Sequence, residues 1–215
     1  LSYFQDGLQQ QVGNDTTRFQ EFIIRDETAD YRNVDVLPYM LADRPTVFIM
    51  ATYSDESFVY SMLRKLKIAS LNFSEVVVYG FPQWMTFDRI DFDLYEDLQV
   101  HVSSAFFLDD QDPDISAFKQ KFFERFGTPP NEEAYTGYES TLYFGRLLKR
   151  YGSQFMRFLP MEDQANLYTT FRIREVHSEP TVLGDRPKAT LPIERYENKF
   201  VQILRFQNYY FQPAE

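Results

Sequence analysis

Cysteine is absent from this chain of 215 residues, which excludes disulfide bonds, thiolate metal sites and a cysteine nucleophile. Histidine occurs only at His101 and His177, and because the two share no local motif, a metal site or catalytic triad is disfavoured. Glycine is scarce, and no predicted strand leads into a Gly-rich phosphate loop. Carboxylates are plentiful, but nothing selects a catalytic pair. We therefore expect no cofactor and no enzymatic activity.

Basic residues are outnumbered, since 22 Lys and Arg face 32 Asp and Glu for a net charge of −10. This balance argues against a nucleic-acid-binding protein, which needs a basic face to neutralise phosphates, and more weakly against docking on an anionic membrane. No segment approaches the roughly 18 consecutive apolar residues of a membrane span. The chain has no signal peptide and starts at Leu1 rather than Met, so we expect a processed or excised piece of a longer protein.

Aromatic residues are unusually frequent, and many lie in a segment that predicts two amphipathic helices between Asp112 and Gly152. Asp112 or Asp114 is expected to cap the first helix, and Gly127 to end it. The second helix is expected to start at Asn131. The residues predicted to face inward are Ile115, Phe118, Phe122 and Phe126 of the first helix, and Tyr135, Tyr138, Leu142 and Leu148 of the second.

The order of residues across this helix pair is specific. The first helix ends in F-x-x-x-F-G, a proline follows, and the second opens with A-Y and then Gly, Tyr and Glu. These residues are Phe122, Phe126-Gly127, Pro130, Ala134-Tyr135 and Gly137-Tyr138-Glu139. The segment resembles the helix pair that follows the returning hinge strand in type I periplasmic binding proteins. That family includes the leucine/isoleucine/valine receptors of ABC transporters, in which three crossing strands link two Rossmann-like lobes.

Strands and helices alternate before Gly80. Predicted strands are Phe19 to Ile24, Thr46 to Ala51 and Glu75 to Tyr79, and predicted helices are Leu1 to Val12, Arg32 to Leu41 (interrupted by Pro38) and Glu56 to Ala69. In the helix that starts at Glu56, we expect Val59, Leu63 and Leu66 to face inward. This alternation is typical of an α/β fold with a Rossmann-like, doubly wound, mainly parallel sheet.

The pattern changes after Gly80. Leu98 to Phe107 is predicted to be a strand that crosses between lobes. Residues Ser153 to Arg195 are broken up by prolines and predicted to be rich in loops. Tyr168 to Val176 and Lys199 to Tyr210 are expected to be two late strands. The resemblance then implies that residues 1–97 are the second lobe, and that residues 98–215 hold the crossing strand, the returning helices of the first lobe and the C-terminal strands. It also implies that the fold is N-terminally truncated, without the opening segment of the first lobe.

Two predicted loops follow buried parallel strands, where open α/β sheets bind ligands. They contain Tyr53 and Ser54 in the first, and Gln83 and Trp84 in the second. The resemblance implies that these four residues bind a small polar solute between the lobes. The alternatives remain open: Ser54 caps the helix that starts nearby, and Trp84 covers the apolar edge of the sheet.

Acidic clusters are a further candidate for a cation site. They comprise Asp109, Asp110, Asp112 and Asp114, and separately Asp88, Asp91 and Asp93. Neither cluster has the Gly and terminal Glu of an EF-hand loop, and acidic residues before helices are usually solvated caps. We therefore expect no metal site.

Two functions follow from the resemblance. The first is a non-enzymatic solute receptor of the bacterial envelope, periplasmic or anchored as a lipoprotein, which binds a small polar ligand such as an amino acid and works with a membrane transporter. The second is a ligand-free scaffold that acts through contacts with envelope proteins in cell-wall maintenance. Because the apolar face formed by Phe118, Phe122, Tyr138 and Leu142 is too apolar for solvent, we expect the fragment to form a homodimer or to be covered by another chain.

Overall fold

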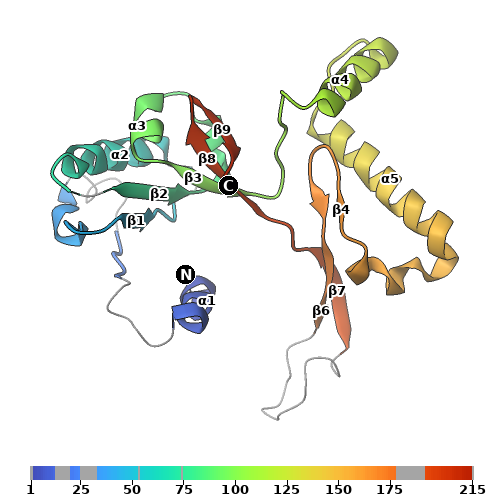
Figure 1. Ribbon diagram of the computed structural model, residues 1–215, viewed down its shortest axis with the longest axis horizontal. Coiled ribbons are helices and arrows are strands. Elements are labelled where there is room, and N and C mark those ends of the chain that lie inside the picture. Colours follow the sequence, from blue (N-terminus) through green and yellow to red (C-terminus); the bar gives the residue numbers. More distant parts are fainter. Residues whose placement is uncertain are drawn as a thin grey trace. The chain divides into compact units, whose positions relative to one another are not determined.

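The computed structural model describes residues 2–12, 20–24, 33–52, 54–73, 75–177 and 192–214 (Figure 1). Its main sheet has five strands in the order β1-β2-β3-β8-β9. Their bounds are β1 Thr46–Ile49, β2 Val76–Gly80, β3 His101–Ser104, β8 Gln202–Gln207 and β9 Tyr210–Pro213. The sheet is mixed and mainly parallel, and β1 and β2 pair in parallel from Thr46↔Val76 to Ile49↔Tyr79. The predicted α/β fold class is therefore confirmed.

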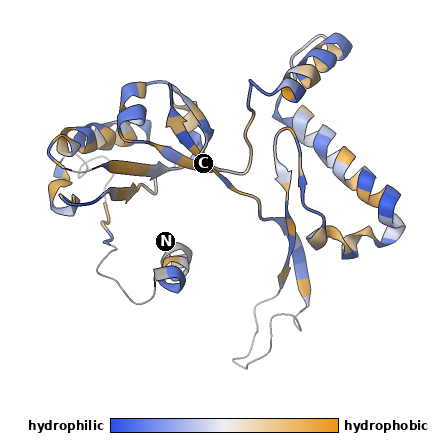
Figure 2. Ribbon diagram, viewed as in Figure 1, coloured by the Kyte–Doolittle hydropathy of each residue, from blue (hydrophilic) through white to orange (hydrophobic). Residues whose placement is uncertain are grey.

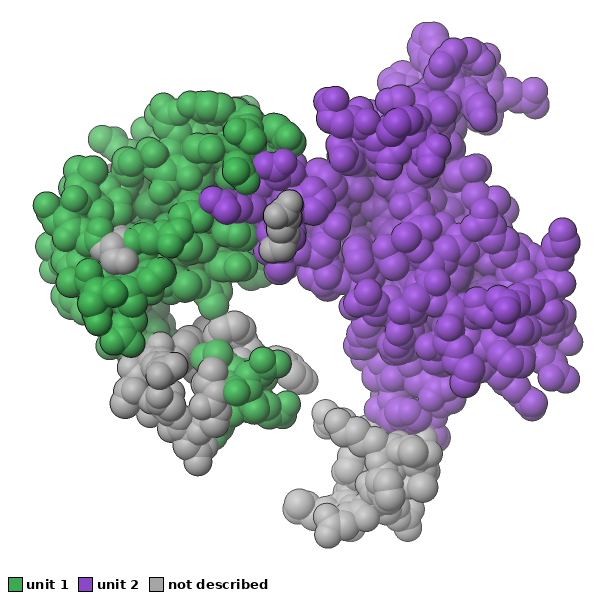
Figure 3. All heavy atoms as spheres, viewed as in Figure 1, with its two compact units in different colours: residues 1–101, 206–210 green, residues 102–205, 211–215 purple. Residues whose placement is uncertain are grey.

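The chain forms two compact units (Figure 3). Unit 1 comprises residues 1–101 and 206–210, and unit 2 comprises residues 102–205 and 211–215. The chain passes from one unit to the other after His101, after Arg205 and after Tyr210. The assignment of residues 1–97 and 98–215 to two lobes of a binding protein stays a prediction.

Helix α2 (Glu56–Ser70) provides much of the core of unit 1. Asp55 caps it, since its Oδ1 accepts a hydrogen bond from the backbone N–H of Phe58 at 2.9 Å. Val59, Leu63 and Leu66 are fully buried, as the helical spacing predicts. Strand β2 is hydrophobic along its length in Figure 2, and its alternate residues Val76 and Val78 are buried as well. A half-buried strand and an apolar helix stripe thus supply the same core.

Short elements complete unit 1: α1 Ser2–Val12, the 3₁₀ turns η3 Leu37–Tyr39 and η4 Pro82–Thr86, and α3 Phe92–Asp97.

Strands β8 and β9 form a hairpin with Asn208 and Tyr209 at its turn. Both residues have positive φ, 57° and 67°, which suits the two-residue turn that right-twisted antiparallel strands favour. The prediction of one strand from Lys199 to Tyr210 is therefore wrong. The chain reverses at Asn208 and Tyr209, and this turn lacks the glycine that usually marks it in a sequence.

Unit 2 is built on α4 (Pro113–Phe126) and α5 (Glu132–Tyr151). Asp112 caps α4 by accepting a hydrogen bond from Asp114 N at 2.7 Å, and Gly127 ends it in the left-handed conformation with φ +72°. Asn131 caps α5 by accepting from Ala134 N at 3.1 Å. The predicted helix pair and its end signals are confirmed.

The buried face of α5 differs from the predicted one. The structure buries Tyr135, Glu139, Tyr143 and Leu147. Tyr138 and Leu148, which were expected inside, are 44% and 49% exposed. The buried stripe includes Glu139, whose Oε1 accepts a hydrogen bond from the backbone N–H of Tyr168 at 2.6 Å. A carboxylate with backbone donors lies inside, so the true stripe contains a charged residue that a count of apolar residues passes over.

The rest of unit 2 packs on the end of α5. Its elements are η5 Gly152–Arg157, η6 Leu159–Met161, and the antiparallel pairs β4 Gln164–Ala165 with β5 Thr170–Phe171 and β6 Ile173–His177 with β7 Ile193–Asn198. Tyr143, Leu147, Leu159 and Ile173 form the centre of this core. The ring of Tyr143 stacks on Phe171 at 4.5 Å. The β6–β7 pair lies partly inside the segment predicted to be rich in loops.

Three other predicted elements need correction. Residues 20–24 form no strand, and Phe19 lies outside the described residues; Phe22 instead contacts the ring of Tyr39 at 5.7 Å. Arg32 lies outside the described residues, and residues 33–41 hold no α-helix but a 3₁₀ residue at Asn33 and the turn η3, because Pro38 cannot donate a helical hydrogen bond. The crossing strand is shorter than Leu98 to Phe107, because Leu98 ends α3.

Candidate functional site

The loops after β1 and β2 lie side by side. Met50 N donates a hydrogen bond to Tyr79 O at 2.8 Å, which continues the pairing of the two strands to their ends. Beyond the strands, Trp84 Nε1 donates to Thr52 O at 3.1 Å. Because both strands are parallel, their carboxyl ends meet at one edge of the sheet, and the structure brings the two predicted binding loops together there.

The first loop leads into α2. Ser54 is exposed, and its carbonyl accepts a hydrogen bond from Glu56 N at 3.1 Å. The helix cap is Asp55 rather than Ser54, so the alternative in which Ser54 caps the helix is wrong by one residue. Tyr53 lies outside the described residues. Glu56 connects this loop to the segment after η4, since its Oε1 accepts from the backbone N–H of Arg89 at 2.7 Å.

Trp84 of the second loop is completely buried. Its ring stacks on Tyr95 with a centroid distance of 6.5 Å and an interplanar angle of 15°. The Tyr95 hydroxyl donates to Trp84 O at 3.0 Å, and burial, with the nearby charge of Glu56 adding to it, raises the pKa of that hydroxyl. The placement matches the interpretation in which Trp84 covers the sheet. No face of the indole is open to a ligand in this conformation.

Gln83 precedes Trp84 in η4 and is half-buried. Of the three predicted site residues that the structure describes, Ser54 is polar and exposed, and Gln83 is polar and half-buried with its amide oxygen buried. The ligand-binding role of Tyr53, Ser54, Gln83 and Trp84 stays a prediction. Two polar residues on loops that share a hydrogen bond can bind a small polar group, with Asp55 and Glu56 adding negative charge beside them.

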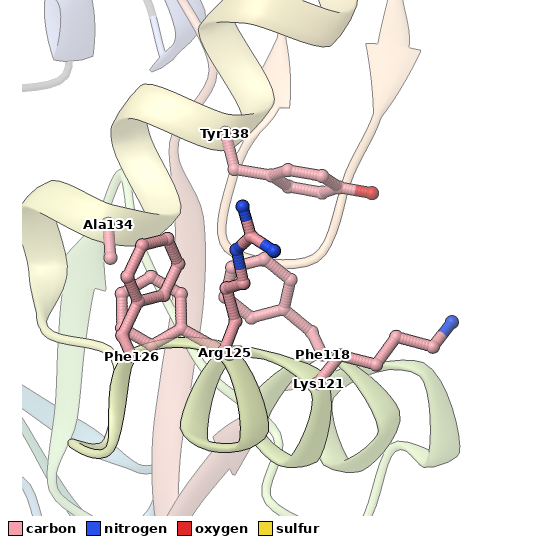
Figure 4. A pocket seen from close by; sticks show the side chains of 7 residues that line it. Phe118, Lys121, Arg125, Phe126, Ala134 and Tyr138 are labelled. Carbon is pink, nitrogen blue, oxygen red and sulfur yellow. The ribbon is translucent and has the colours of Figure 1, made fainter.

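A concave feature lies in unit 2, and three of its lining residues, Phe118, Phe122 and Tyr138, belong to the apolar face that the sequence predicts to be covered by another chain. The groove has a volume of about 390 Å³ and runs between α4 and α5 (Figure 4). It is lined by Phe118, Lys121, Phe122, Arg125, Phe126, Ala134 and Tyr138. A cavity of about 450 Å³ adjoins it, and Phe118, Lys121 and Tyr138 line both. The signal available in the sequence was the aromatic spacing of α4, which predicts an inward face and, in this fragment, an apolar surface that another chain covers.

The residues considered for catalysis or metal binding have structural contacts. His101 stacks on Tyr79 at 4.8 Å, and His177 lies 3.4 Å from a carboxylate oxygen of Glu175. In the acidic cluster before α4, Asp112 is the helix cap and Asp110 pairs with Lys119, which helps to raise the pKa of that lysine. Over the described ranges, no group of three or more His, Asp or Glu side chains converges as a metal site.

Comparisons with known proteins return one partial likeness. No protein-family model and no curated protein matches the chain. Among solved structures, it is similar to an ABC transporter substrate-binding protein from Desulfitobacterium hafniense in complex with Leu, with 14% identity and a TM-score of 0.37. The match covers 71% of this chain and 39% of that protein, so the chain spans well under half its length. None of the helices described is long and apolar enough to cross a membrane.

Proposed function

We propose that the chain is part of a non-enzymatic binding protein of the bacterial envelope, and that the loops after β1 and β2 hold a small polar solute such as an amino acid. One observation carries the proposal: the hydrogen bond from Trp84 Nε1 to Thr52 O joins two loops at the carboxyl ends of neighbouring parallel strands. Both loops present polar side chains at this edge. A membrane transporter or another envelope protein is the partner we propose.

The charges beside the loops favour a particular solute. Asp55 and Glu56 lie at the start of α2, where carboxylates are favoured by the helix dipole. They make the edge electronegative and suit the ammonium group of an amino acid. The hydroxyl of Ser54 and the amide of Gln83 supply both donors and acceptors for its remaining polar atoms. Trp84 acts in this proposal as a positioning residue, because its buried ring fixes the loop that carries Gln83.

Calorimetry against a panel of amino acids and small polar solutes tests this proposal. Replacement of Gln83 or Ser54 by Ala should weaken binding by about tenfold for each lost hydrogen bond, which corresponds to roughly 1.4 kcal/mol. The matched control is Ser61→Ala, which removes an exposed hydroxyl that bonds to the carbonyl of Ser57 in the same helix. Equal loss in all three variants would remove the two loops from the site.

A second function is a scaffold that acts through protein contacts in cell-wall maintenance. The complete burial of Trp84 favours it, because the aromatic side chain expected to contact a ligand is used for packing. The open groove between α4 and α5 favours it as well. A protein that keeps its fold and binds no member of the solute panel would support the scaffold over the receptor.

A further inference from the structure

The groove between α4 and α5 has a continuous aromatic floor. The rings of Phe126 and Phe122 lie 4.5 Å apart, those of Phe122 and Phe118 lie 5.9 Å apart, and Phe118 lies 4.8 Å from Tyr138. Phe126 is 63% exposed and Tyr138 is 44% exposed, so the floor is open to solvent rather than part of a closed core. We call this feature the aromatic groove. It comprises Phe118, Lys121, Phe122, Arg125, Phe126, Ala134 and Tyr138.

Two cations border the aromatic groove. Lys121 and Arg125 lie four residues apart on α4, and both are exposed. Figure 4 shows the Arg125 side chain rising from α4 toward Tyr138 of α5. Within the part of the chain that the structure describes, neither cation has a carboxylate partner, whereas Lys119 of the same helix is paired with Asp110. The aromatic groove thus carries two exposed basic side chains, unpaired within the described ranges, on a chain of net charge −10.

We propose that the aromatic groove binds an acidic amphipathic helix of a partner protein. The first and last of the three phenylalanines lie eight positions apart on α4, or about 12 Å, which matches roughly two turns of a docked helix. Apolar side chains at i and i+4 of such a helix meet the rings. Acidic side chains with the same spacing reach Lys121 and Arg125, which lie about 6 Å apart along α4.

The same features disfavour other occupants. Nucleic acid and an anionic lipid surface both require a broad basic face, and here two cations stand on a strongly acidic chain. A small apolar solute is normally enclosed on most of its surface, whereas Phe126 leaves the aromatic groove open. A second copy of the chain also carries a net charge of −10, and self-association is therefore measured as a separate outcome of the test. The proposal is independent of the solute site, because every groove residue belongs to unit 2.

Fluorescence anisotropy of a labelled helical peptide tests the proposal. The probe carries Leu at i and i+4 with Glu on both flanks, and the comparison probe has Lys in place of each Glu. We expect the Glu probe to bind at least tenfold more tightly and to lose affinity as salt is raised. Phe126→Ala, and separately the double change Lys121→Glu with Arg125→Glu, should each weaken the Glu probe by tenfold or more.

Two controls keep the test specific. Phe123→Ala removes an aromatic ring of α4 that is 57% exposed and does not line the aromatic groove. Lys149→Glu reverses an exposed charge in the last turn of α5. Both should leave affinity unchanged, and circular dichroism should show the same helix content in all variants. Equal affinity for the two probes, or unchanged affinity in Phe126→Ala, would overturn the proposal. If the protein self-associates and Phe126→Ala abolishes the self-association, the occupant of the aromatic groove is a second copy of this chain and the proposed partner helix is wrong.

Discussion

The ring of Trp84 lies against Gly80 so closely that a side chain at residue 80 cannot be accommodated in place. A Cβ added to Gly80 would come within 2.4 Å of the indole. The strand end and the buried ring therefore fix each other, and with them the loop that carries Gln83. The position of the proposed solute site thus depends on a contact inside the core.

Gly80→Ala should destabilise the fold, because the new methyl group must displace a fully buried ring. We expect the free energy of unfolding to fall by about 1–3 kcal/mol, the usual effect of overpacking. Gly137→Ala is the control, since a Cβ there meets nothing within 4 Å and the residue lies inside α5. That change should stabilise the protein by roughly 0.5–1 kcal/mol. Urea titration of both variants measures the difference, and a neutral Gly80→Ala would contradict the packing described here.

Trp84→Ala should be more damaging, because it removes a completely buried side chain and its hydrogen bond to Thr52 O. We expect a loss of about 3–5 kcal/mol, as for other large-to-small core changes. Trp84→Phe keeps a six-membered ring but loses the indole N–H and part of the buried volume, with an expected cost of about 1–3 kcal/mol. Thermal and chemical unfolding check both values. A stable Trp84→Ala protein would indicate that the ring is not part of the core in solution.

At the start of α2, the neighbouring residues Ser54 and Asp55 should differ in how much they contribute to stability. Asp55→Ala should cost about 1 kcal/mol, because the backbone N–H of Phe58 loses its acceptor. Ser54→Ala should change stability by less than about 0.5 kcal/mol, since Ser54 is exposed and is not the cap. Chemical denaturation distinguishes the pair. The reverse ranking would restore Ser54 as the cap and weaken its assignment to the solute site.

Local signals in the sequence predicted the elements with strong boundaries. Asp112, Gly127 and Asn131 each have a side chain or a backbone freedom that ends or starts a helix, so α4 and α5 were predictable. That residues 20–24 form no strand was not predictable. An extended apolar segment becomes a strand only when a neighbouring strand supplies its hydrogen bonds.

The candidate sites divide in the same way. That the loops after β1 and β2 meet follows from parallel strands, and it was predictable. The burial of Trp84 depends on the absence of a side chain at Gly80, a tertiary contact that spacing does not reveal. An apolar face at Phe118, Phe122 and Tyr138 that another chain covers was predictable, but the aromatic groove was not. The spacing of the α4 phenylalanines predicts a shared face and says nothing of its shape or of the cations beside it.

Glu139 gives the last prediction, on the pH dependence of stability. Burial raises the pKa of its carboxyl above the ordinary value of 4.5, and backbone N–H groups of Tyr168, Thr169 and Leu167 oppose this in part. The native state therefore holds this proton to higher pH than the unfolded chain does. The stabilisation is complete below the ordinary value and is lost as pH rises through the raised pKa.

Glu139→Gln should remove that dependence, because the amide resembles the protonated acid and its oxygen still accepts from Tyr168 N. We expect the stability of the native sequence to rise relative to the Gln variant as pH is lowered from 7 toward 4. Glu139→Ala should instead cost about 1–3 kcal/mol over the whole range, because a backbone donor loses its acceptor. Urea titrations at several pH values give all three curves. A native curve that falls relative to the Gln variant on acidification would mean that the backbone donors outweigh burial and that the pKa of Glu139 is lowered.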